Sequence, residues 1–194
     1  MVQYAYTYMK IAGNNQSSLH IGLIRATRAH FVYILAVILQ IIIYDASKLI
    51  TPQAVFRRWL AAAVFMLAVL SIWYAVRTKI RTNSTYKRLI LSLILSDIAF
   101  ASYQVYTQRG MASRAVVLYI LPIAVSAILA TRSAIFGTAG LCITAYSATA
   151  ISYFYLNFNE GYKVELYGEV GFYSALFLIT ASLTWILVRS KQHR

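Results

Sequence analysis

Residues 56–76, FRRWLAAAVFMLAVLSIWYAV, decide the fold class of this chain. After Arg58 the stretch continues without a charged side chain, and its length approaches the roughly 20 residues that a helix needs to cross about 30 Å of hydrocarbon. An open strand would leave backbone groups unpaired in lipid, so we expect helices. Further apolar runs lie at about 30–46, 89–107, 115–131, 134–156 and 169–188. The sequence therefore predicts an all-α, polytopic membrane bundle of six transmembrane helices.

The composition of the 194 residues agrees with a membrane location, since 60% of them are apolar and only 12% are charged. That charged share is about half of what soluble domains carry. The net charge of +13 would indicate nucleic acid in a soluble protein. Here the basic residues lie mainly in short segments between apolar runs, as topology and attraction to anionic lipid predict. We therefore expect the lipid bilayer as a partner, and no nucleic acid.

The distribution of Lys and Arg predicts that both ends of the chain lie in the cytoplasm. In that orientation twelve basic residues fall on inner segments and six on outer segments. Short inner loops are enriched in Lys and Arg, so the twofold difference favours this topology. The strongest predicted cytoplasmic anchor is residues 77–88, RTKIRTNSTYKR, with Arg77, Lys79, Arg81, Lys87 and Arg88.

Three parts are expected along the chain. Residues 1–29 are predicted to be a cytoplasmic or interfacial segment that is broken at Gly13–Ser18. Residues 30–189 would form the six-helix transmembrane domain, and residues 190–194 a cytoplasmic tail. The short connection at Thr131–Ser133 predicts an antiparallel pair of helices on either side of it.

Asp97 is the most informative polar residue, because it lies near the middle of the third apolar run. An ionised carboxylate at that depth costs several kcal/mol, so Asp97 must face the bundle interior, be protonated or find a partner. Ser96 adjoins it, and Gln104 follows seven residues later on the same face. Tyr146 and Tyr153 of the fifth run are possible hydrogen-bond donors. Two interpretations stay open, a proton or ligand site and a carboxyl group held by a neighbouring hydroxyl for structural reasons.

Two further features concern the shape and packing of the helices. Pro122 removes a backbone hydrogen bond from the fourth run and predicts a kink there. Gly137 and Gly140 give the fifth run a face of small residues. Such a face predicts close helix packing, within the chain or between two copies.

The sequence offers no set of catalytic or metal-binding residues. It has no glycine-rich phosphate loop and no Cys/His metal spacing, and the single Cys142 excludes an internal disulfide. His20, His30 and His193 are far apart, and we expect them to be peripheral. We therefore predict no catalytic residue, no metal and no cofactor.

Several short stretches carry a family resemblance, and they are spread over residues 24–190: Arg25–Arg28 (RATR), Leu95–Ala99 (LSDIA), Arg109–Ser113 (RGMAS), Tyr119–Ala124 (YILPIA) and Ala130–Ala134 (ATRSA). This region resembles the six-helix membrane sensor domain that begins certain bacterial sensor histidine kinases, including those that control type IV pilus genes. The resemblance implies a dimeric module in the bacterial inner membrane, which passes a signal through its last helix.

One departure from those kinases limits the expected activity. In them the sixth helix continues into a coiled coil, a phosphoacceptor histidine and an ATP-binding domain. Here the sequence stops at Arg194, and the surroundings of His193 do not resemble a phosphoacceptor site. We expect a non-enzymatic sensory or regulatory module that forms a homodimer or joins other membrane subunits. The alternatives are an accessory or structural subunit of a larger membrane complex, and a small transporter or channel.

Overall fold

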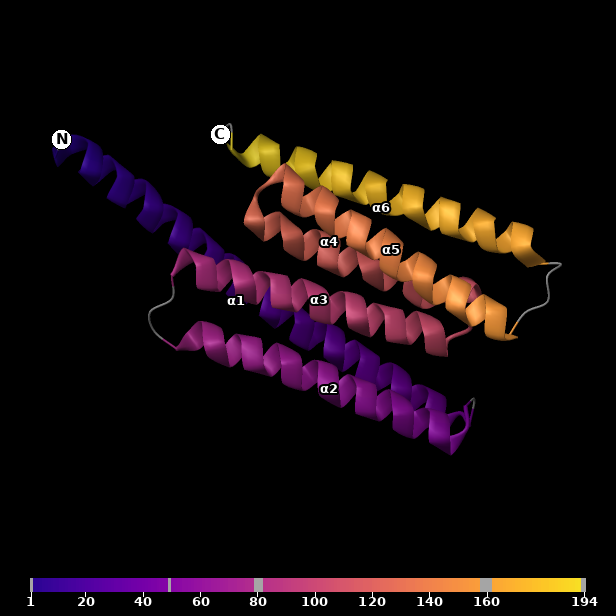
Figure 1. Cartoon of the computed structure of the whole chain (residues 1–194). Coiled ribbons are helices and arrows are strands. Elements are labelled where there is room, and N and C mark those ends of the chain that lie inside the picture. Colours follow the sequence, from indigo (N-terminus) through magenta and orange to yellow (C-terminus); the bar gives the residue numbers. More distant parts are fainter. Residues whose placement is uncertain (1, 49, 79–81, 158–161, 193–194) are drawn as a thin grey trace. The chain divides into compact units, whose positions relative to one another are not determined.

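The computed structural model describes residues 2–48, 50–78, 82–157 and 162–192, and this part of the chain contains helices and turns but no strand (Figure 1). Its α-helices are α1 (Val2–Ala46), α2 (Pro52–Arg77), α3 (Asn83–Thr107), α4 (Ile120–Ser126), α5 (Arg132–Asn157) and α6 (Lys163–Gln192). Three 3-10 helices are η1 (Gly110–Ala112), η2 (Arg114–Tyr119) and η3 (Ala127–Leu129). Each of these α-helices except α4 includes a stretch that is long and apolar enough to cross a membrane. The predicted all-α membrane bundle of six helices is confirmed.

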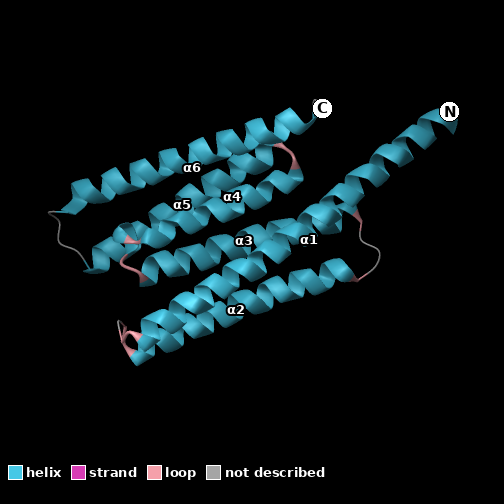
Figure 2. Cartoon of the chain, turned by 180° about the vertical axis from the view of Figure 1, so that it is seen from behind, coloured by secondary structure: helices cyan, strands magenta, loops and turns pink. Residues whose placement is uncertain are grey.

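Two compact units, Met1–Leu89 and Ile90–Arg194, make up the chain, and each is described by itself. The first unit contains the antiparallel hairpin of α1 and α2 (Figures 1 and 2). The oxygen of Thr51 accepts the backbone N–H of Ala54 at 3.3 Å, and Pro52 occupies the first helical position. Both residue types favour a helix start at these positions, so the sequence fixes where α2 begins.

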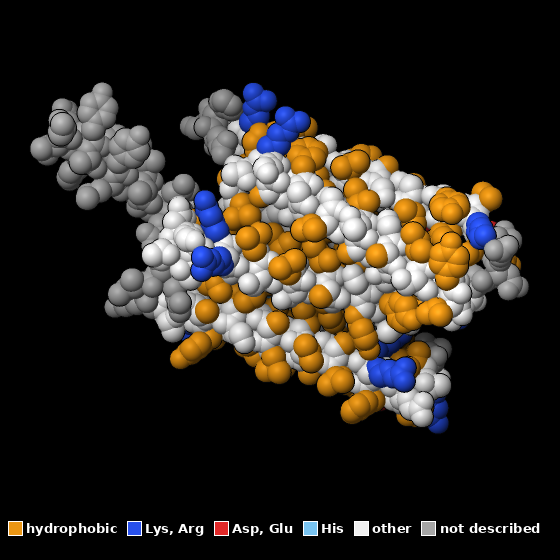
Figure 3. Space-filling model, in the orientation of Figure 1, with side chains coloured by type: hydrophobic (Ala, Val, Ile, Leu, Met, Phe, Trp, Pro, Cys, Tyr) orange, Lys and Arg blue, Asp and Glu red, His pale blue; other side chains and the backbone are white. Residues whose placement is uncertain are grey.

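Buried apolar residues recur at helical spacing on both helices of this hairpin. On α1 they include Ile34, Val37 and Ile41, and on α2 they include Phe65 and Val69. The exposed positions are also apolar, and Figure 3 shows hydrophobic side chains along the helices, with Lys and Arg near the helix ends. A helix that is apolar on all sides fits a bundle whose outer surface contacts lipid.

The predicted break in the N-terminal segment is wrong, because α1 continues through Gly13–Ser18 as one helix of 45 residues. The first proline of the chain is Pro52, so each added residue can extend the backbone hydrogen-bond ladder of α1. Gly, Asn and Ser each lower helix stability by at most about 1 kcal/mol relative to Ala, which is too little to end a helix.

The second unit contains the antiparallel pair α5 and α6, with α4 packed against both (Figure 2). The connection from α4 to α5 is as tight as the sequence predicts. Ala130 has a left-handed backbone with φ 51°, and the Thr131 side chain accepts the N–H of Ala134 at 3.3 Å. Ala130 thus reverses the chain direction, and Thr131 caps the start of α5.

The fourth apolar segment differs from the regular helix that its composition predicts. Residues Arg114–Leu129 form η2, α4 and η3, so only the central seven residues are α-helical. A 3-10 helix rises about 2.0 Å per residue and an α-helix about 1.5 Å, so this winding extends the segment to about 28 Å instead of about 24 Å. Pro122 lies in the first turn of α4, where its missing N–H has no required partner. It marks the change of winding, and the predicted kink stays a prediction.

Candidate functional site

Tyr119, the last residue of η2, is the centre of a buried polar site in the second unit. Its side chain is fully buried, and its hydroxyl lies 2.7 Å from Oγ of Ser102 on α3. The Ser102 hydroxyl donates its hydrogen to the backbone carbonyl of Ile98 at 2.8 Å, so the Tyr119 hydroxyl is the donor to Ser102. The thiol of Cys142 on α5 donates to the backbone carbonyl of Tyr119 at 3.6 Å. Tyr119 therefore joins α3 and α5 through its two ends.

Four aromatic rings form a cluster around Tyr119, which we call the aromatic cluster: Tyr119, Tyr146, Tyr173 and Phe177. The ring centroid of Tyr119 lies 6.1 Å from that of Tyr146 and 5.6 Å from that of Phe177. Tyr146 also meets Tyr173 edge to face at 5.4 Å. Offset and edge-to-face pairs at such distances contribute about 0.5–1.5 kcal/mol each beyond their burial. The cluster connects η2 and α5 to α6.

Asp97 lies next to this site and is buried, with 4% of its surface exposed. It is close enough to Cys142 for the two side chains to interact electrostatically. The role predicted for Asp97 in binding or proton exchange stays a prediction.

The other residues that the sequence groups with Asp97 lie elsewhere. Ser96 donates to the carbonyl of Ser92 at 2.9 Å, and Gln104 accepts from the Gln108 amide at 3.1 Å, so both bond within α3. The hydroxyl of Tyr146 is buried and has no hydrogen-bond partner in the part of the chain that the structure describes. It therefore does not hold the Asp97 carboxyl.

Tyr153 lies toward the end of α5, where its ring packs against the turn that follows α3. Its ring meets that of Tyr106 edge to face at 5.6 Å. Gly110 in this turn has φ +59°, and a Cβ at this position would lie 2.6 Å from Cδ1 of Tyr153. Only glycine combines this backbone conformation with so close a contact. Tyr153 thus has a clear packing partner about 16 Å along α5 from Cys142.

Gly137 and Gly140 contact no other described helix of the second unit, and the packing within the chain that the sequence predicts for them stays a prediction. Both lie on the exposed face of α5, and a Cβ at either position would meet no atom within 4 Å. The sequence identified a small-residue face but could not tell which direction it takes. Packing between two copies remains a prediction.

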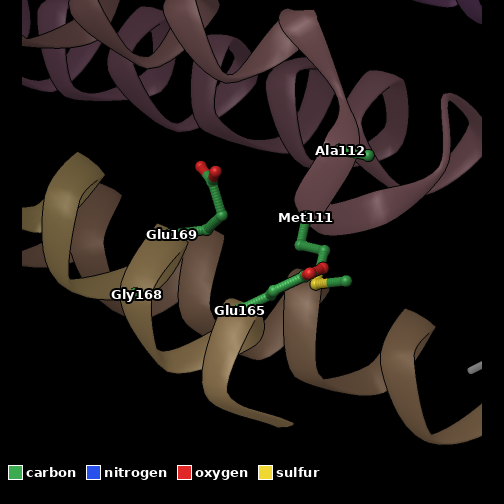
Figure 4. Close-up of a pocket in the computed structure, with 5 residues that line it drawn as sticks. All are labelled: Met111, Ala112, Glu165, Gly168 and Glu169. Atoms are coloured by element: carbon green, nitrogen blue, oxygen red, sulfur yellow. The ribbon is translucent and has the colours of Figure 1, made fainter. Parts of the chain in front are cut away.

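A groove of about 280 Å³ lies between η1 and the start of α6. Its lining residues are Met111 and Ala112 of η1 and Glu165, Gly168 and Glu169 of α6 (Figure 4). In the view of Figure 4 the Glu165 side chain extends toward Met111, while the Glu169 side chain points in another direction. Sequence reasoning missed this groove because the last apolar run was expected to begin at about residue 169, whereas α6 begins at Lys163. The four-residue spacing of the two glutamates is the signal that could have indicated it.

The sequence also missed a buried polar layer in the first unit. His30 is fully buried, which corrects the expectation that it is peripheral. Its Nδ1 donates to the carbonyl of Ala26 at 2.7 Å, and the Thr27 hydroxyl bonds the carbonyls of Leu23 and Ile24. These bonds to α1's own backbone allow polar side chains on a buried face. Thr27 follows the buried Leu23 by four residues and His30 precedes the buried Ile34 by four, and this helical spacing was the available signal.

The predicted cytoplasmic anchor is only partly described. Arg77 is exposed and its guanidinium lies 4.0 Å from the ring centroid of Trp73. Lys87 and Arg88 are exposed in the first turns of α3. Lys79 and Arg81 lie outside the described residues.

Taken together, the long apolar helices and the buried polar site define a multi-pass membrane helical domain. Within the residues described, no group of three His, Cys, Asp or Glu side chains could hold a metal ion. Residues 11–194 match the family of PilS-like transmembrane domains. The chain belongs to this family, as its resemblance to the sensor domain predicts. No curated protein and no solved structure matches the chain.

Proposed function

We propose that the chain is a sensory or regulatory module of the bacterial inner membrane, without catalytic activity of its own. Its membership of the PilS-like transmembrane domains supports this proposal, because this type of domain is the sensor part and not a catalytic part. The structural observation that carries the proposal is the burial of Asp97 on α3, the helix whose Ser102 bonds the Tyr119 hydroxyl. A buried carboxyl group is costly in a membrane and commonly marks a functional site.

The contacts around Tyr119 provide a physical route from Asp97 to the last helix. Asp97 lies on α3 five residues before Ser102, and the Ser102 hydroxyl bonds the hydroxyl of Tyr119 at 2.7 Å. The Tyr119 ring packs on Phe177 of α6 with centroids 5.6 Å apart. A change in the charge or hydrogen bonding of Asp97 would therefore alter the packing between η2 and α6. The helix α6 continues to Gln192, beyond the apolar run that ends near Val188, so a shift of α6 reaches the membrane surface.

We also propose a second copy of the chain or another membrane subunit as the partner, with both ends of the chain in the cytoplasm. The exposed small-residue face at Gly137 and Gly140 supports such an association, because small residues allow two helices to approach closely.

Deletion and complementation in the native host test the proposed function. Deleting the gene should change the levels of a defined set of transcripts, and the wild-type gene should restore them. Asp97→Asn keeps the size of the side chain but removes its charge, so it should fail to restore the transcripts. Ser96→Ala is the matched control, since Ser96 bonds only the carbonyl of Ser92 in its own helix, and it should restore them fully.

Two results would contradict the proposal. One is a deletion strain with unchanged transcripts that fails to assemble a membrane complex, which would identify an accessory subunit. The other is loss of uptake of a solute in proteoliposomes containing Asp97→Asn, which would identify a transporter.

A further inference from the structure

One end of the first unit carries a concentration of positive charge that this unit does not neutralise. Arg25 and Arg28 on α1 and Arg77 at the end of α2 are all exposed, as are Lys87 and Arg88 of α3. His20 and Tyr86 pack with ring centroids 5.6 Å apart, which places the start of α3 beside α1 at this end. The described part of the first unit has one acidic residue, Asp45, and it follows Tyr44 at the opposite end of α1. The basic side chains at this end therefore form a surface that attracts anions from outside the unit.

Two of these arginines flank an aromatic pair that joins α1 to α2. The rings of Phe31 and Trp73 meet edge to face, with centroids 6.1 Å apart and planes at 86°. Arg28 precedes Phe31 by three residues, about 4.5 Å of helix rise, and Arg77 follows Trp73 by four residues, about 6 Å. Because α1 and α2 are antiparallel, both arginines lie on the same side of the aromatic pair.

The guanidinium of Arg77 is held in place by its own helix. Its Cζ lies 4.0 Å from the ring centroid of Trp73, which is a cation–π contact. Stacking fixes the plane of the guanidinium while leaving its N–H groups at the edge available for an anion. Neither Arg28 nor Arg77 takes part in an ion pair within the described residues.

An apolar surface continues from the arginines along α1. Val32 and Leu35 are 69% and 64% exposed, and they follow Arg28 by four and seven residues. This spacing places them on the face of α1 that carries Arg28. A molecule that binds here therefore meets two cationic groups at one end and a hydrocarbon surface along its length.

We propose that Arg28 and Arg77 bind the headgroup phosphate of an anionic phospholipid, whose acyl chain lies along Val32 and Leu35. Guanidinium groups match phosphate geometry and bind it through paired N–H···O bonds. The Phe31–Trp73 pair lies between the charged and the apolar parts, at the depth where aromatic rings favour the membrane interface. The lipid supplies the negative charge that the first unit lacks.

Reconstitution of the full chain in nanodiscs of defined lipid tests this site. The wild-type protein should unfold at a higher temperature in phosphatidylglycerol than in phosphatidylcholine, and native mass spectrometry should detect retained phosphatidylglycerol. The double variant Arg28→Gln/Arg77→Gln should lose most of the added thermal stability. Affinity for the lipid should fall about fivefold for each arginine removed, since a basic residue near an anionic surface contributes about 1 kcal/mol.

The chain offers a matched control at the opposite end of the same hairpin. The Arg58 guanidinium lies 5.0 Å from the ring centroid of Tyr44, so Arg58→Gln also removes an arginine stacked on an aromatic ring. Asp45 adjoins Tyr44 and supplies negative charge there. Arg58→Gln should therefore retain the stabilisation by phosphatidylglycerol. Arg77→Lys, which keeps the charge but loses the planar stack, should retain part of it.

Three outcomes would overturn the proposal. One is stabilisation of the double variant by phosphatidylglycerol to the same extent as the wild type, and another is an equal loss of stabilisation in Arg58→Gln and Arg77→Gln. The third is an effect of inorganic phosphate in phosphatidylcholine nanodiscs that equals the full effect of phosphatidylglycerol, which would assign the site to a soluble anion.

Discussion

Different interactions stabilise the interior of each of the two units of the chain. In the first unit, α1 and α2 are long, regular helices, and the buried side chains of Thr27 and His30 bond to the backbone of α1 itself. In the second unit, Arg109, Gly110 and Ala130 have left-handed backbones, and η2 and η3 flank a short α4. Hydrogen bonds there cross between helices, from Tyr119 to Ser102 and from Cys142 to the Tyr119 carbonyl.

This difference shows what specifies a particular packing inside a membrane. Lipid tails are as apolar as leucine side chains, so an apolar stripe gives little preference for one helix partner over lipid. The second unit adds the hydrogen bonds from Tyr119 to Ser102 and from Cys142 to Tyr119, and each of them requires one particular neighbour. We therefore expect substitutions in the second unit to have large and position-specific effects.

The largest effect is expected for Phe177→Ala, which would break the aromatic cluster. Phe177 is fully buried against Tyr119 and Tyr146. Removing its ring leaves a cavity, so the free energy of unfolding should fall by about 3–5 kcal/mol. Unfolding in mixed micelles by increasing SDS measures this. Phe172→Ala is the control, since Phe172 is 64% exposed on the same helix, and equal losses for both variants would contradict the role of the cluster.

The next largest effect is expected at the left-handed turn. In Gly110→Ala the new Cβ would meet Tyr153 at 2.6 Å and the backbone would keep φ +59°. Strain of these two kinds should lower the free energy of unfolding by about 2–3 kcal/mol, measured as above. Gly137→Ala adds the same methyl group where no atom lies within 4 Å. Gly137→Ala should be neutral or stabilising by up to about 1 kcal/mol. An equal loss of unfolding free energy in both variants would contradict the strain expected at Gly110.

Opposite effects are expected when two buried tyrosines lose their hydroxyl groups. Tyr119→Phe removes the bond to Ser102 and should lower the free energy of unfolding by about 1 kcal/mol. Tyr146→Phe removes a buried hydroxyl without a partner among the described residues, and it should raise the free energy of unfolding by about 1 kcal/mol. Unfolding of the two variants by increasing SDS measures the sign of each change in the free energy of unfolding. Destabilisation by Tyr146→Phe would show that its hydroxyl has a partner after all.

The smallest effect is expected at Ala130, which ends η3 with φ 51°. Glycine adopts this conformation without steric cost, so Ala130→Gly should raise the thermal unfolding midpoint, with a gain of about 0.5–1 kcal/mol. Ala148→Gly, in the exposed middle of α5, is the control and should lower stability by a similar amount. A lower midpoint for both variants would mean that the backbone at Ala130 is not strained.

Sequence alone predicts the long helices well because membrane crossing demands long apolar runs. The expected run at 134–156 corresponds to α5, Arg132–Asn157, and the run at 56–76 to α2, Pro52–Arg77. The winding of Arg114–Leu129 could not be predicted, since 3-10 and α-helices accept the same apolar residues.

The polar site was predictable in part. A charge in the middle of an apolar run indicates a buried position, and Asp97 is buried. Helical spacing tells which residues share a face but not which helix that face meets. For this reason Gln104 lies on a buried face yet bonds Gln108, and a Cβ at Gly137 or Gly140 of α5 would meet no atom within 4 Å.

The length of α1 has a mechanical consequence. Its residues before His30 precede the apolar run that is expected to cross the membrane, and they continue that run as one helix about 42 Å long. A tilt of about 10° at His30 would displace the far end of this helix by about 7 Å, so a small reorientation of the apolar run becomes a larger movement at the N-terminal end of α1.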